Sequence, residues 1–271
     1  MTTPPTIHPT RPAMETDLDR AHAVMDRSDD LRLQFYERLA DTDLFILLDA
    51  EPTGDSVRPA LFAVEGASYA LAFDAEERLS AFTGRAAPYA GLPGRALAQM
   101  MAGQGIGLAL NLQTAPSEML IPADAVDWLA ATLNHAPEQA EARLTGVSRP
   151  TGLPDAVLEA LDRKLSRCAG LADHALLVAA DYADGGRGHV LAFVDAPETA
   201  HAALAHAAGE ALTFSGIEAG TMDVMFVASG DAVAGRLARV ALRFDLPELQ
   251  RPTPAVPMAP GSDPSSPPKL R

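Results

Sequence analysis

One strand-to-helix pattern occurs in each half of this chain and limits how the chain can fold. Residues 69–77 and 189–198 each read as an apolar strand that ends on an aspartate, with a glutamate three residues later and an alanine-rich helix beyond. Such an aspartate is typical of a helix N-cap, so Asp74 and Asp195 are expected to cap the helices that follow. The pattern indicates one supersecondary plan used twice, as after an internal duplication. Independent helix starts with the same chemistry are the alternative.

Apolar spacing predicts helices and short strands in both halves. In the first half we expect a helical stretch from 14 to 39 split at 28–30, strands at 44–50, 61–64, 69–73, 108–112 and 119–121, and helices after Asp74, at 95–102 and after the cap Asp124. In the second half we expect helices at 155–169, 197–212 and 232–242, and strands at 175–181, 190–194 and 223–228.

Composition marks the boundaries between these parts. Residues 145–154 hold two prolines and two glycines with little periodicity, which favours a linker. Seven prolines fall between Pro252 and Pro268, which favours an extended tail. We therefore expect an α+β protein of two compact domains, each with a small mixed sheet and flanking helices. The expected ranges are a disordered N-terminus (1–13), a first domain (14–145), a second domain (153–250) and a Pro-rich tail (251–271).

The charge balance argues against two classes of partner. The chain carries a net charge of −15, and residues 1–148 account for −11 of it. An acidic surface repels phosphate backbones and anionic lipids, so we expect no nucleic acid and no membrane partner. The sequence has no apolar run long enough for a membrane span and no secretory h-region, and Cys168 is its one cysteine. These features predict a cytoplasmic protein, with Cys168 buried as a small apolar residue.

The candidate reactive groups do not form a recognisable catalytic set. Glu198 and His201 have the spacing of a di-iron ligand pair, but the second copy that such sites need is missing. The glycines of 103–107 lack nucleotide-binding spacing and precede a strand. Asp49 and Glu51 lie two residues apart at a strand end, where they could hold a cation or act in acid–base chemistry. Nothing supplies them a partner, so we expect no catalytic residues, no metal and no cofactor.

The best candidate for recognition is the segment 88–95. It combines an aromatic residue, two prolines, two glycines and an arginine, and its expected contact residues are Tyr89, Leu92 and Arg95. A packed structural loop is the alternative. The tail has a balance of +2 against an acidic body, so we expect its end, Lys269, Leu270 and Arg271, to dock on that body.

Several of these motifs resemble those of the SseB-like family (enhanced serine sensitivity protein B). The resemblance is carried in the first half by 35–51, 71–79, 88–95 and 120–129, and more loosely in the second half by 223–226, 244–247 and the Pro-Pro-Lys-Leu-Arg end. It implies a bacterial cytoplasmic α+β protein with SseB-type N-terminal and C-terminal domains. It supplies no catalytic residues that could be transferred to this chain.

Two functions remain open from the sequence. The absence of a convergent catalytic set, together with two modules and a Pro-rich tail, favours a non-enzymatic protein that acts by binding a protein partner. The alternative is a small-molecule sensor, for instance of an amino acid, or an enzyme linked to amino-acid metabolism. That alternative rests on Asp49 and Glu51.

Overall fold

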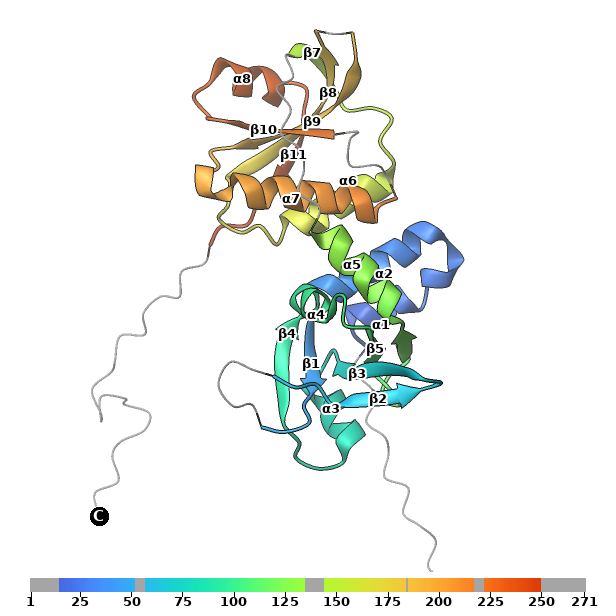
Figure 1. Ribbon diagram of the computed structural model, residues 1–271. Helices are drawn as coiled ribbons and strands as arrows, with labels where there is room; N and C mark the ends of the chain where they lie inside the picture. The colour runs from blue at the N-terminus through green and yellow to red at the C-terminus, as the bar shows by residue number, and fades with distance from the viewer. Residues whose placement is uncertain (1–14, 52–56, 135–143, 184, 217–221, 250–271) are drawn as a thin grey trace, which may run out of the picture.

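The computed structural model describes residues 15–51, 57–134, 144–183, 185–216 and 222–249. This part of the chain forms eight α-helices and two mixed sheets, one sheet in each half (Figure 1). The expected α+β architecture with two successive modules is confirmed. We call the two modules the first and the second unit.

The first unit is built on a sheet with the strand order β4-β1-β3-β5-β6, and β2 adds to β3. Strand β1 runs antiparallel to β3 and β4, whereas β3 and β5 run parallel. The elements are α1 (Asp17–His22), a 3-10 turn (Met25–Arg27), α2 (Asp29–Asp41), β1 (Asp43–Leu47), β2 (Leu61–Val64), β3 (Ala67–Phe73), α3 (Glu76–Thr83), β4 (Tyr89–Pro93), α4 (Gly94–Met101), β5 (Ile106–Leu110), β6 (Met119–Ile121) and α5 (Ala123–Leu133).

The second unit has the strand order β10-β9-β8-β11, and β7 adds to β8. Its elements are β7 (Leu144–Ser148), α6 (Asp155–Leu165), β8 (His174–Tyr182), β9 (Arg187–Val194), α7 (Glu198–Phe214), β10 (Met222–Val227), α8 (Ala232–Ala238) and β11 (Leu242–Asp245). Strand β8 is antiparallel to β9, and β9 is parallel to β10.

The two sheets share a three-strand arrangement. In both, an antiparallel pair (β1 with β3, β8 with β9) is followed by a parallel neighbour (β5, β10). An edge strand, β4 or β11, completes each sheet on the other side. The edge strands occur at different points along the chain, since β4 precedes β5 but β11 follows β10. The repeated sequence pattern therefore corresponds to a shared topology of the central strands.

Each sheet has a larger helical layer on one face and a single helix on the other. Leu44, Ile46 and Leu108 face the layer of α1, α2, α4 and α5, whereas Phe73 faces α3. In the second unit α6 and α7 cover one face and α8 packs on the other. The larger layers face each other (Figure 1). Phe214 of α7 is fully buried within the core of the first unit, so the apolar interior continues between the units.

The expected aspartate caps are wrong. Helix α3 begins after Ala75, α5 begins after Pro122 and α7 begins after Pro197, and none of these helices has a side-chain cap. The Asp74 carboxylate instead accepts hydrogen bonds from Thr16 and Arg78. Asp195 accepts from the Ser229 amide at 2.8 Å. Thr16 and Ser229, both distant in sequence, thus compete successfully with the nearby helix amides for these carboxylates.

Three short strands were not predicted. The sequence predicts a loop at 88–95, but this segment contains β4, which pairs along β1. The expected helix 232–242 ends at Ala238, and Leu242 begins β11. The sequence predicts a linker at 145–154, but Leu144–Ser148 form β7, which pairs with β8. The second sheet therefore begins before residue 153, where the second domain was expected to start. Each strand is four or five residues long and is defined by its pairing with β1 or β8.

Candidate functional site

The outer edge of β2 is the feature best suited to bind another chain. Strands β2 and β3 are joined by a two-residue turn, 65–66, in which both residues have positive φ (50° and 89°). In such a hairpin the residue pair next to the turn exchanges hydrogen bonds, so Val64 and Phe62 bond to β3. The backbone N–H and C=O groups of Leu61 and Ala63 then point outward. Among the described strands, none pairs with this side of β2.

The side chains of this edge are apolar and exposed. Leu61 is 54% exposed and Phe62 is 42% exposed, and Ala63 is exposed as well. Proteins commonly protect a free strand edge with a charge, a proline or a bulge. The strand Leu61–Val64 contains none of these. The β2–β3 hairpin extends to one side of the first unit (Figure 1), where another strand could reach it.

A second feature is a group of charged side chains between the units, which we call the interdomain ion cluster. Its members are Glu37, Asp41, Arg95, Arg163, Lys164, Arg167, His206 and Glu210. The Lys164 Nζ of α6 lies 2.9 Å from an oxygen of Asp41 in α2 and 2.9 Å from an oxygen of Glu210 in α7. Arg95 Nη1 of α4 lies 3.0 Å from Glu210. Each unit therefore contributes an acid and a base to the contact.

The electrostatics of this cluster keep its groups charged. Burial disfavours the Lys164 ammonium, but the Asp41 and Glu210 carboxylates outweigh burial and raise the Lys164 pKa. Burial also disfavours the Asp41 and Glu210 carboxylates, but their basic partners lower the pKa of both. A group that acts as a general acid or base needs a pKa near neutrality. These shifts move away from neutrality, so the cluster is suited to holding the two units together.

A buried polar network joins α1 to the first sheet. The Asp19 carboxylate accepts hydrogen bonds from Arg78 and from Ser117, the latter at 2.5 Å. Arg78 also donates to Asp74 at 2.8 Å, and the Asn111 amide donates to Ser117 at 2.8 Å. Burial opposes ionisation of Asp19, but its hydrogen bonds outweigh burial and lower its pKa to about 2. The described side chains satisfy one another, so this network is a structural link.

The residues expected to form a recognition surface lie in different surroundings. Tyr89 is 43% exposed, and Glu76 raises its pKa. Leu92 pairs opposite Leu44 and packs on the core of the first unit. Arg95 belongs to the interdomain ion cluster. The three residues therefore lie at the surface, against the core and in the interdomain ion cluster, and they do not form one recognition surface.

Of the remaining expected site residues, the structure describes Asp49 and Glu51. Asp49 and Glu51 are exposed beyond the end of β1, and neither has an ion pair with another described residue. Lys269, Leu270 and Arg271 are outside the described residues. The docking of the tail therefore stays a prediction.

The other candidate chemistry is placed as follows. Within the described part of the chain, no group of three or more His, Cys, Asp or Glu side chains could hold a metal ion. The His201 ring stacks on Phe226 with centroids 3.7 Å apart, and it contacts the Ala196 carbonyl. Cys168 is buried, and burial raises its pKa. No helix among the described residues has the length and apolar character needed to cross a bilayer.

The fold and these surfaces describe a two-unit α+β protein with an open apolar strand edge and an ion-paired contact between its units. Residues 18–128 match the family model described as the SseB protein N-terminal domain. The match runs from α1 into α5 and so includes all the strands of the first sheet. The resemblance to the SseB-like family is therefore confirmed for residues 18–128, and the family's C-terminal domain is not confirmed. No curated protein and no solved structure matches the chain.

The strand edge on β2 was not recognised as a site from the sequence, although the hairpin itself was. Its signal was available: Leu61–Val64 is an uncharged apolar strand beside a turn. Whether such a strand is central or at an edge depends on the pairing of the remaining strands. A single-strand pattern carries no information about those pairings.

Proposed function

We propose that this protein is a non-enzymatic interaction module that captures an extended segment of a protein partner as an added strand on β2. The observation that carries the proposal is the outward edge of Leu61 and Ala63, with free backbone groups and exposed apolar side chains. Strand addition uses such an edge, because main-chain hydrogen bonds supply affinity and alternate side chains supply specificity.

The charge of the first unit indicates the chemistry of the partner. Residues 1–148, which include this hairpin, carry a net charge of −11. Complementary charge speeds association and suppresses wrong partners. We therefore propose a segment in which apolar and basic residues alternate. We also propose that the protein is cytoplasmic, supported by its single cysteine.

A proline substitution tests this mode of binding. The Ala63 N–H points away from β3, so Ala63→Pro removes an outward donor and leaves the β2–β3 hydrogen bonds in place. The matched control Ala63→Val keeps the N–H group and favours a strand. The probe is a short fluorescent peptide of alternating valine and lysine, and its binding is measured by fluorescence anisotropy. Circular dichroism checks the fold of both variants.

We expect the peptide to bind the parent chain and the Ala63→Val variant, and to bind the Ala63→Pro variant about tenfold more weakly. A peptide of alternating valine and glutamate should bind less well than the lysine peptide because of the acidic first unit. Equal binding to both Ala63 variants would show that β2 is not the docking edge. If the purified chain forms a dimer that Ala63→Pro dissociates, the occupant is a second copy and the proposed partner is wrong.

A further inference from the structure

A pocket in the second unit lies where two edge strands meet. Strand β8 is paired along one side by β7 at residues 179–182 and by β11 at residues 174–177. Val178 lies between the two pairings. The chain leaves β7 through 149–153 on its way to α6, and it enters β11 through 240–241. These segments border an open pocket of about 350 Å³.

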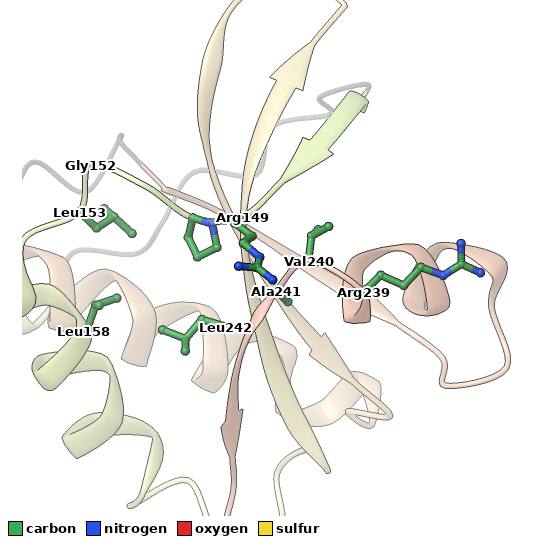
Figure 2. Close-up of a pocket in the computed structure, with 9 residues that line it drawn as sticks. Arg149, Gly152, Leu153, Leu158, Arg239, Val240, Ala241 and Leu242 are labelled. Atoms are coloured by element: carbon green, nitrogen blue, oxygen red, sulfur yellow. The ribbon is translucent and has the colours of Figure 1, made fainter.

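Six apolar residues, a glycine and two arginines line this pocket, and one of the arginines is directed into it. Pro150, Leu153, Leu158, Val240 and Leu242 line it together with two arginines, Arg149 and Arg239. Figure 2 shows the Arg149 guanidinium lying between the leucines and Ala241, whereas the Arg239 side chain extends away from them. Among the described residues, Arg149 has neither a hydrogen bond nor an ion pair. Its donors are therefore available to a ligand.

One wall of the pocket, the 149–153 segment, is held to the sheet, and the lining is positively charged whereas the chain is acidic. The His189 ring of β9 lies 3.1 Å from the Thr151 carbonyl, which ties the 149–153 segment to the sheet. No lining residue carries a carboxylate, although the chain has a net charge of −15. The arginines of the lining therefore favour an anionic ligand. A ligand ammonium group would find no carboxylate to pair with. A guanidinium binds a carboxylate through two parallel hydrogen bonds, and the leucines offer an apolar contact.

We propose that this pocket, which we call the seam pocket (Arg149, Pro150, Leu153, Leu158, Val240 and Leu242), binds a small carboxylic acid with a branched aliphatic chain. The Arg149 guanidinium holds the carboxylate, and Leu153, Leu158 and Leu242 contact the aliphatic chain. Pockets for small ligands begin at about 300 Å³, so the volume suits a ligand of this size. This binding site is independent of the β2 edge, which lies in the other unit.

The test uses 4-methylpentanoate as the probe and two-dimensional amide NMR of the full chain as the readout. The uncharged control is 4-methylpentanamide, and acetate is the control without a branched chain. We expect 4-methylpentanoate to shift resonances of residues 149–153 and 240–242, and the two controls to bind at least about tenfold more weakly. Leucine adds an ammonium group to the same skeleton, and it should also bind more weakly than 4-methylpentanoate.

Two arginine variants separate this site from general charge effects. Arg149→Gln should weaken binding of 4-methylpentanoate by about 10- to 100-fold. Arg236→Gln removes an exposed arginine of α8 that does not line the pocket, and it should leave the affinity unchanged. Both side chains are exposed, so neither change is expected to unfold the chain.

Several results would overturn the proposal. They are the absence of shifts at the seam pocket with millimolar 4-methylpentanoate, equal affinity of the Arg149→Gln variant, and binding of leucine or the amide as tight as that of the acid. The peptide Gly-Gly-Leu with a free carboxylate is the last comparison. Tighter binding of this peptide than of 4-methylpentanoate would identify a site for chain termini and contradict the small-acid assignment.

Discussion

Lys164 in α6 and Asp41 in α2 lie 2.9 Å apart across the boundary between the two units. Both side chains are buried, with 6% and 8% exposed. Glu210 in α7 also lies 2.9 Å from Lys164, so one ammonium group pairs with a carboxylate from each unit. Because both carboxylates are buried, removing Lys164 leaves them with partly exposed basic partners, Arg95 and Arg167.

The first prediction concerns this cation. Lys164→Met should lower the free energy of unfolding by about 3–5 kcal/mol, because Asp41 and Glu210 lose their shared partner. Arg187→Ala breaks an exposed pair with Asp181 and should cost less than about 1 kcal/mol. Urea unfolding measures both changes. Equal losses for the two variants would contradict a buried, interdependent cluster.

The second prediction concerns acid stability. The pKa of Asp19 is about 2, below its ordinary value of 3.8, so the folded state favours the ionised form. Its stabilisation is complete above pH 3.8 and is lost as the pH falls from 3.8 toward 2. Between pH 3.8 and pH 2 the parent chain should lose about 2 kcal/mol of unfolding free energy through Asp19, and the Asp19→Asn variant should not show this loss.

Asp245→Asn is the control for this acid effect, since the Asp245 side chain is 75% exposed. Urea unfolding at a series of acidic pH values gives the dependence for each variant. A parent and an Asp19→Asn variant with parallel pH profiles would show that the Asp19–Arg78 contact does not supply the acid-sensitive stability.

The third prediction concerns two helical glycines. A Cβ atom at Gly94 would lie 1.9 Å from the Leu39 carbonyl oxygen, so Gly94→Ala should force α4 away from α2 and cost about 1–3 kcal/mol. A Cβ atom at Gly235 in α8 meets no atom within 4 Å. Gly235→Ala should stabilise by up to about 1 kcal/mol, because alanine favours the helix. Thermal and urea unfolding check the opposite signs, and losses in both variants would contradict the close approach of α2 and α4.

The fourth prediction concerns the thiol. Cys168 Sγ is buried and lies 3.5 Å from the Lys164 carbonyl, and burial raises its pKa. The thiolate is the reactive form, so native Cys168 should react with an aromatic disulfide reagent about a hundredfold or more slowly than in the unfolded chain. The rate in buffer and the rate in denaturant are compared directly. Rapid reaction in buffer would show an open path to the thiol.

Local features were predictable from the sequence. The Glu65-Gly66 turn and its two strands, and the helix break at Ser28, lie as expected because this turn and the Ser28 cap depend on adjacent residues. The spacing of Val126 and Leu129 likewise indicated a helix with a buried face, and both side chains are buried in α5.

Long-range features were not predictable. Asp74 has the local chemistry of a cap, but the Thr16 hydroxyl, which lies 58 residues earlier, donates a hydrogen bond to its carboxylate in the folded state. The sequence predicts a recognition role for Arg95, whereas in the structure its guanidinium pairs with Glu210, which lies 115 residues later. The short strands β4, β7 and β11 form because β1 and β8 present unpaired edges. Information of this kind resides in the packing of distant segments, which a single sequence pattern does not encode.

Hydrogen exchange at the outward amides tests the central proposal most directly. The backbone N–H groups of Leu61 and Ala63 have no partner strand in the described structure. We expect both amides to exchange rapidly in the free protein and to become protected when the valine–lysine peptide is bound, while Phe62 and Val64 are protected in both states. Unchanged exchange at Leu61 and Ala63 with peptide bound would contradict strand addition on β2.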